Sequence, residues 1–139
     1  MTSPLERLKD LTAEAPDGRE FAGLKRAGLA RLKDAGNKDV SREGRFDLAY
    51  NAAHSLSLAA LRYRGYRPKN RYIVFQVLPH TLGLQAEVWR VLAKCHDLRN
   101  KAEYEGELDI DDRILADLIV ACDTVAKALE TLKPIQLLK

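Results

Sequence analysis

The chain has 139 residues and a mass of 15.6 kDa, enough for one compact domain with its own core and too short for two comfortable ones. Its formal net charge of +3 is too small to indicate a partner by itself. No apolar run approaches the roughly 18 to 20 residues that cross a bilayer, and the N-terminus is charged where a signal peptide needs an apolar centre. We therefore expect a single cytoplasmic domain over residues 1–139 that makes no membrane contact.

The first 37 residues carry signals for two helices. Ser3-Pro4-Leu5-Glu6 is a capping box with proline in the first turn, which predicts a short helix to about Glu14. Residues 15–18 then break the chain. A second helix is predicted over residues 19–35, with Gly36-Asn37 suited to a left-handed C-cap. The prediction is an N-terminal helical hairpin over residues 1–37.

One long helix is predicted from Ser41, as its N-cap, to Gly65. Its apolar stripe consists of Phe46, Ala49, Ala53, Leu56 and Ala60. The many alanines permit close approach of a neighbouring helix, so we expect this helix at the centre of a bundle. A polar row on an adjacent face consists of Asp47, Asn51 and His54.

The segment RYRGYRPKNRY, residues 62–72, contains five cations, three tyrosines and no acid. The cations are Arg62, Arg64, Arg67, Lys69 and Arg71. Guanidinium groups pair with phosphate oxygens and aromatic rings stack on bases, which predicts a nucleic-acid-binding segment. The alternative is structural, because cations near a helix C-terminus complement its dipole and surface turns are commonly charged.

Three further helices follow. A short one is predicted over residues 70–82, disturbed by Pro79 and ended at Gly83; the composition of residues 72–78 also suits a buried strand, but no partner strand is evident. The next runs over residues 85–104 and is ended by Gly106, and the last, capped by Asp109 or Asp111, reaches Leu132. The predicted fold is an all-α antiparallel bundle over residues 41–132, in which short connections place the long helix 41–65 beside the helix 85–104.

The predicted helix 85–104 carries a second polar row at offsets of zero, three, four and seven: His96, Arg99, Asn100 and Glu103. If the two helices are neighbours, the two polar rows meet. Purely structural roles are the alternative: Arg99 pairs with Glu103 or with Asp47, and Tyr104 packs its ring against a neighbouring helix. The cysteines of the last two helices, Cys95 and Cys122, lack a CxxC spacing, so we expect buried free thiols, no metal and no cofactor.

The order of a long helix with FDLAYNAAHSLSLAALRYRGYRP, a short helix, RNKAEYEG and a closing amphipathic helix resembles the HEPN (higher eukaryote and prokaryote nucleotide-binding) family over residues 41–132. The resemblance implies a four- to five-helix bundle, usually dimeric, and in many members a metal-independent ribonuclease of toxin–antitoxin or antiviral systems. The family motif is Arg, a polar residue, and His after four to six intervening residues. Arg99 and Asn100 match its start, and Tyr104 replaces the His, as in members with an R-x-x-A-[DE]-Y pattern.

RNA cleavage needs a base for the 2′-hydroxyl, a proton donor for the leaving oxygen and positive charge at the phosphorus. We expect Arg99 to supply charge and Asn100 a hydrogen bond to phosphate. Glu103, His96 or His54 would act as base or acid, with Tyr104 as donor, if the polar rows converge across a dimer cleft. The predicted function is that of a homodimeric ribonuclease or of a degenerate RNA- or nucleotide-binding protein. The alternatives are a non-catalytic interaction protein, as partner or antitoxin of a nucleotidyltransferase or toxin, and a structural homodimer.

Overall fold

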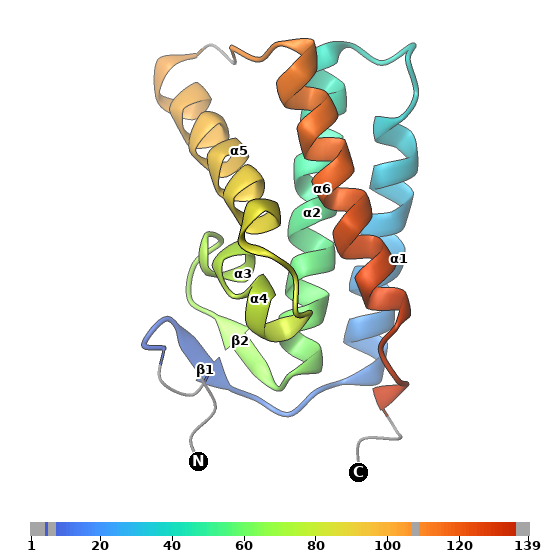
Figure 1. Ribbon diagram of the computed structural model, residues 1–139, viewed down its shortest axis with the longest axis vertical. Coiled ribbons are helices and arrows are strands. Elements are labelled where there is room, and N and C mark those ends of the chain that lie inside the picture. Colours follow the sequence, from blue (N-terminus) through green and yellow to red (C-terminus); the bar gives the residue numbers. More distant parts are fainter. Residues whose placement is uncertain (1–4, 6–7, 107–108, 136–139) are drawn as a thin grey trace.

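The structure is a computed structural model that describes residues 5, 8–106 and 109–135, and it is mostly helical (Figure 1). The elements in chain order are β1 (Leu11–Ala13), α1 (Gly18–Ala35), α2 (Arg42–Tyr63), β2 (Tyr66–Pro68), α3 (Ile73–Gln76), α4 (Leu78–Thr81), α5 (Ala86–Glu105) and α6 (Asp112–Glu130). The predicted all-α bundle is confirmed, with α1, α2, α5 and α6 as its long helices. In the part of the chain that is described, no helix has both the length and the apolar character needed to cross a bilayer.

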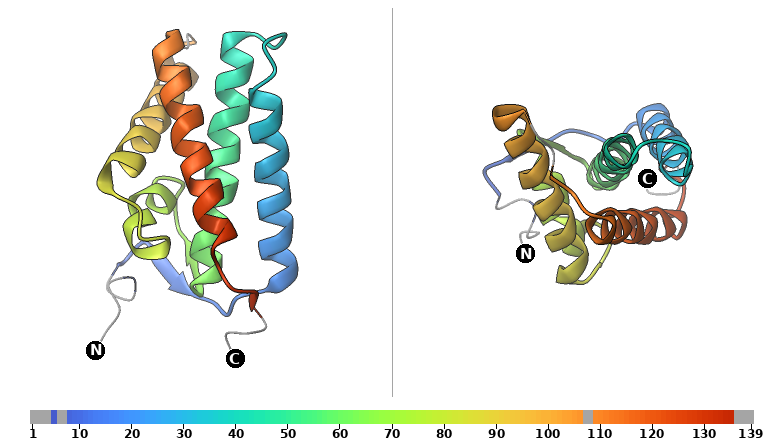
Figure 2. Two further views of the ribbon diagram at one scale, coloured as in Figure 1. Left: turned by 45° about the vertical axis from the view of Figure 1, so that its right-hand side comes forward. Right: turned by 90° about the horizontal axis from the view of Figure 1, so that it is seen from above.

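Helix α2 lies at the centre of the bundle, packed chiefly on α1 and α6 (Figure 2). All five residues of its predicted apolar stripe are buried. The closest approach is to α1, where a Cβ added at Gly28 would lie 2.6 Å from Leu56 Cγ. Glycine at this position therefore allows the two helices to pack together. Cys95 and Cys122 are free and buried, as predicted.

Local capping signals mark several helix ends correctly. Ser41 Oγ accepts a hydrogen bond from Gly44 N, and Asp111, rather than Asp109, caps α6 by accepting one from Ile114 N. Gly106 ends α5 with a left-handed φ of 76°. Gly36 ends α1 as predicted, but with a right-handed φ of −78° instead of a left-handed one.

The predicted N-terminal helical hairpin is wrong. The start of its first helix at Ser3 lies outside the described residues, but Leu11–Ala13 form a strand that pairs antiparallel with β2, with Leu11 opposite Pro68 and Ala13 opposite Tyr66. The pairing continues beyond the strands, since Glu14 N donates to Gly65 O. The capping box is a local signal, and here a partner strand more than 50 residues away determines the conformation.

The predicted single helix over residues 70–82 is two short helices, α3 and α4, which meet at Val77. Pro79 lies in the first turn of α4, where its missing N–H costs no hydrogen bond. The buried face of these helices, Ile73, Val74, Phe75, Val77 and Leu78, fills the space between α2 and α5. The side chains of α3 and α4 lie between one end of α5 and α2, so α5 and α2 are in contact over only a limited stretch.

Candidate functional site

The two predicted polar rows meet where α5 contacts α2. Arg99 on α5 forms an ion pair with Asp47 on α2, which is one of the two structural partners expected for this arginine. On the same side, Tyr50 Oη lies 2.8 Å from His96 Nδ1. The juxtaposition of the rows is therefore confirmed, and His96 lies at its centre.

Both ring nitrogens of His96 are hydrogen-bonded. Nδ1 contacts Tyr50 Oη, and Nε2 lies 3.0 Å from Asn100 Nδ2, one turn further along α5. With the amide in this orientation Nε2 accepts, so the neutral ring carries its proton on Nδ1 and donates it to the Tyr50 hydroxyl oxygen. Asn100 is exposed. The group hydrogen-bonded to the basic nitrogen of His96 is therefore an amide at the surface.

Aromatic rings lie around this histidine, and two cations lie against the ring of its partner Tyr50. The Tyr72 ring lies 5.6 Å from the His96 ring, in an edge-to-face arrangement, and Phe75 lies 6.4 Å away. Two guanidinium groups approach the Tyr50 ring, that of Arg71 at 5.9 Å and that of Arg99 at 5.8 Å. The site therefore combines a histidine with positive charge from two separate parts of the chain.

The electrostatics keep both the histidine and the tyrosine neutral. Burial lowers the pKa of His96, opposed by Asp97 and Glu103 and reinforced by Arg71. Burial also raises the pKa of Tyr50. The pKa of His54, which lies edge to face with Phe75, falls to about 4, because of burial, then the charge of Arg71, and in acid the charge of protonated His96. At neutral pH, His96 is therefore an uncharged acceptor, and two arginines lie against the ring of its partner Tyr50.

Arg62, from the predicted nucleic-acid-binding segment, lies in the interior with a side chain only 1% exposed. Its Nε donates to Glu20, its Nη1 to the carbonyl oxygens of Glu14 and Tyr66 at 3.0 and 3.2 Å, and its Nη2 to Ala15 O at 2.8 Å. It ties the start of α1 and the end of β1 to the end of α2. No surface of its guanidinium remains for a phosphate.

The other cations of the segment divide into two groups. Arg67 is paired with Glu14 and Glu20, at 2.6 and 2.8 Å, and its hydrogen bonds lower the pKa of both carboxyl groups. Arg64 donates to Thr81 O at 2.9 Å. Lys69 and Arg71 are exposed and form no ion pair within the described residues. The segment has no acid in sequence, but the fold brings two to it.

The remaining predicted residues lie at the edge of the site. Asn51 donates to Asp47 O, within its own helix. Glu103 is exposed and close enough to raise the pKa of His96. Tyr104 is 91% exposed, so the expected packing of its ring against a neighbouring helix is wrong. The polar row of α5 therefore continues past His96 into open solvent.

Sequence reasoning missed the aromatic part of the site. Tyr50 lies between Asp47 and His54 at helical spacing, and a count that included hydroxyl groups would have placed it in the polar row. For Tyr72 the sequence predicts only a stacking role within the basic segment. Its place beside His96 depends on how α3 folds back between α2 and α5, for which no local signal exists.

The site consists of one neutral histidine, two arginines and hydroxyl or amide donors. Among residues 5, 8–106 and 109–135, no three His, Cys, Asp or Glu side chains form a group able to hold a metal ion. Comparison with protein-family models, with curated proteins and with solved structures finds no match to this chain. A function is therefore inferred from the geometry of the site.

Proposed function

We propose that this protein binds the phosphate backbone of single-stranded RNA at the site around His96 and cleaves it without a metal ion. The observation that carries the proposal is the neutral His96 ring, which is hydrogen-bonded to the exposed Asn100 and to Tyr50, the residue whose ring the guanidinium groups of Arg71 and Arg99 approach. The resemblance to the HEPN family agrees with it. A nucleotidyltransferase or toxin as partner stays a prediction.

Phosphate binding rests on donors that the fold leaves unused. Arg71 has no acidic partner within the described residues, and Asp47 takes only the Nη1 donor of Arg99. A guanidinium group presents five N–H donors, and although the Nε of Arg99 is buried without a partner, its Nη2 donors stay unused for a phosphate oxygen. Lys69 adds a further exposed cation next to Arg71 in sequence. The exposed ring of Tyr104 offers a base a surface for stacking.

The proposed cleavage uses the unprotonated Nε2 of the neutral His96 ring as the base. Its Nε2 takes the proton of the 2′-hydroxyl, the 2′ oxygen attacks phosphorus, and the bond from phosphorus to the 5′ oxygen breaks, leaving a cyclic phosphate. The arginines stabilise the charge that develops on the phosphoryl oxygens, and water at this open site protonates the leaving oxygen. Because the pKa of His96 is lowered, the base is already unprotonated at neutral pH, and the rate falls only when acid protonates it.

The test is incubation of labelled single-stranded RNA, and of DNA of the same sequence, with purified protein in EDTA. We expect cleavage of RNA alone, since DNA lacks the 2′-hydroxyl. His96→Ala should lower the rate by about 100-fold or more while RNA binding persists. Arg71→Ala should weaken binding and reduce the slope of log affinity against log salt by about one.

Arg90→Ala is the matched control, because Arg90 is an exposed arginine of α5 outside the site. It should leave cleavage and binding close to wild type. Cleavage that survives in His96→Ala would assign the activity to a contaminant or to another base. Absence of RNA binding even at low salt would overturn the proposal as a whole.

A further inference from the structure

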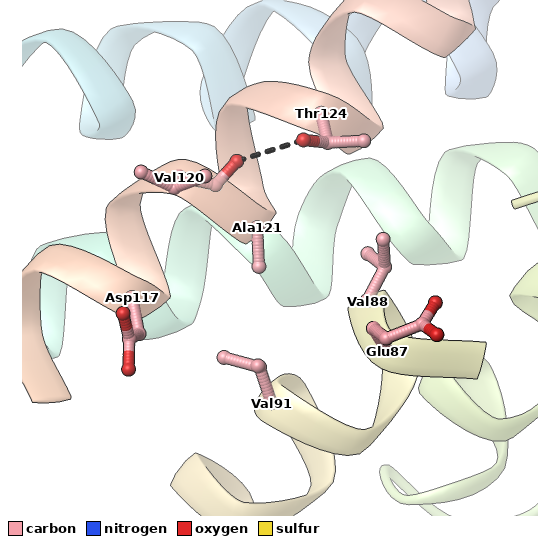
Figure 3. A pocket seen from close by; sticks show the side chains of 7 residues that line it. All are labelled: Glu87, Val88, Val91, Asp117, Val120, Ala121 and Thr124. Atoms are coloured by element: carbon pink, nitrogen blue, oxygen red, sulfur yellow. Dashed lines mark hydrogen bonds between the residues drawn. The ribbon is translucent and has the colours of Figure 1, made fainter. Parts of the chain in front are cut away.

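Helices α5 and α6 enclose a groove on the face of the bundle away from α1, with a volume of about 320 Å³ (Figure 3). It is lined by Glu87, Val88 and Val91 of α5 and by Asp117, Val120, Ala121 and Thr124 of α6. Val91 and Ala121 point into the space between the helices, and Val120 is 65% exposed. We name this feature the α5–α6 groove.

The charged side chains that line the groove are both acidic. Glu87 and Asp117 are its only charged lining residues, and neither forms an ion pair within the described part of the chain. The hydroxyl of Thr124 donates to Val120 O at 3.0 Å and is therefore already used. An occupant that fits must present a convex apolar side chain with basic side chains on either side of it.

One exposed side chain of the described chain meets this requirement. The large hydrophobic residues exposed among the described residues are Leu29, Tyr104 and Val120. Val120 belongs to the groove itself. Tyr104 lies between two glutamates, which would be repelled by the acidic residues of the groove. Leu29, on α1, has basic neighbours on its own face.

The face of α1 around Leu29 is complementary to the groove in charge. Arg26 and Lys33 lie three residues before and four residues after Leu29, are exposed, and form no ion pair within the described residues. The groove carries one acidic residue from each of its helices, Glu87 from α5 and Asp117 from α6.

We propose that the α5–α6 groove of one copy of this chain binds α1 of a second copy, with Leu29 in the groove and Arg26 and Lys33 facing its acidic edges. Within one chain the contact is impossible, because α2 and α6 separate α1 from α5 (Figure 2). The two surfaces differ, so the interface is heterologous. Each bound pair retains one free groove and one free α1 face, and assembly continues beyond the dimer as concentration rises.

Sedimentation velocity of the full chain over a range of concentrations tests the proposal. Wild type should form species larger than a dimer. Leu29→Asp and Val120→Asp should each raise the dissociation constant at least tenfold, so that each variant alone is monomeric. An equimolar mixture should form a 1:1 heterodimer that grows no further, because the groove of the first variant and the α1 face of the second are both intact.

Tyr104→Asp is the matched control, since it removes another exposed large apolar side chain and should assemble as wild type does. Arg26→Glu keeps the Leu29 side chain and should still weaken assembly, because it places a negative charge against the acidic edge of the groove. Far-UV circular dichroism checks that each variant is folded. A mixture of the two monomeric variants that stays monomeric would overturn the proposal. Loss of assembly in Val120→Asp but not in Leu29→Asp would also overturn it, since that result would indicate a symmetric groove-to-groove dimer. A wild type that is monomeric at every concentration would overturn it as well.

Discussion

Replacing Arg62 with alanine separates a structural role of the arginine-rich segment from a role in binding RNA. The Arg62 guanidinium is buried and donates to a carboxylate of α1 and to three backbone carbonyl oxygens from residues 14, 15 and 66. Alanine leaves those carbonyl groups without their donor and leaves a void behind. We therefore expect a loss of folding stability, with RNA binding by the folded protein unchanged.

The size of the loss follows from the burial. Removing one partner of a buried ion pair costs about 3 to 5 kcal/mol, and the lower end applies here because Glu14 and Glu20 keep Arg67 as a partner. An unfolding entropy of about 2.1 cal/mol/K per residue gives about 0.3 kcal/mol/K for a chain of this length. The melting temperature of Arg62→Ala should therefore fall by about 10 °C.

Thermal unfolding followed by circular dichroism measures this change, with Arg90→Ala as the exposed control, for which we expect less than about 0.5 kcal/mol. RNA binding is measured well below the melting temperature of the variant. A melting temperature within about 2 °C of wild type, together with lost RNA binding, would refute the structural assignment of Arg62. The carboxyl pKa values of Glu14 and Glu20 are lowered, so the ion pairs of these residues contribute to folding stability above pH 4.5, and the contribution is lost as acid protonates the carboxylates. Wild type should therefore lose more stability in acid than Arg62→Ala, which lacks part of these pairs.

Three further predictions concern packing and titration. Gly28→Ala should lower the free energy of unfolding by about 1 to 2 kcal/mol, measured in urea, because the clash with Leu56 exceeds the gain in helix propensity. At Gly23 no neighbouring element lies within 4 Å of an added Cβ, so Gly23→Ala should raise the free energy of unfolding by about 0.5 to 1 kcal/mol. Equal effects of the two substitutions would contradict the close approach of α1 to α2. The His54 ring should titrate near pH 4 by NMR, and a midpoint near pH 6.5 would exclude the buried position. The contribution of His54 to folding stability should be complete above pH 6.5 and decline towards pH 4. This pH dependence of stability should disappear in His54→Phe. The thiols of both cysteines, whose pKa values burial raises to about 12, should react with Ellman's reagent only after unfolding, and fast labelling of the native protein would show that the core is open.

The sequence by itself determined the helical elements whose signals are local. Ser41 and Gly106 mark ends of α2 and α5, and the apolar stripe of α2 is the buried one, because capping and helical periodicity depend on residues within one or two turns. The same periodicity placed Asp47 and Arg99 on facing polar rows, and the two side chains do pair.

Only the tertiary structure decided the rest. Residues 11–13 form a strand because a partner strand lies alongside them, and Arg62 is buried because Glu20, 42 residues earlier, folds onto it. The enclosure of His96 by Tyr50 and Tyr72, and the groove between α5 and α6, likewise depend on how separate helices pack. Such contacts join residues that are distant in the chain, and no propensity of a short segment encodes which distant partner will be adjacent.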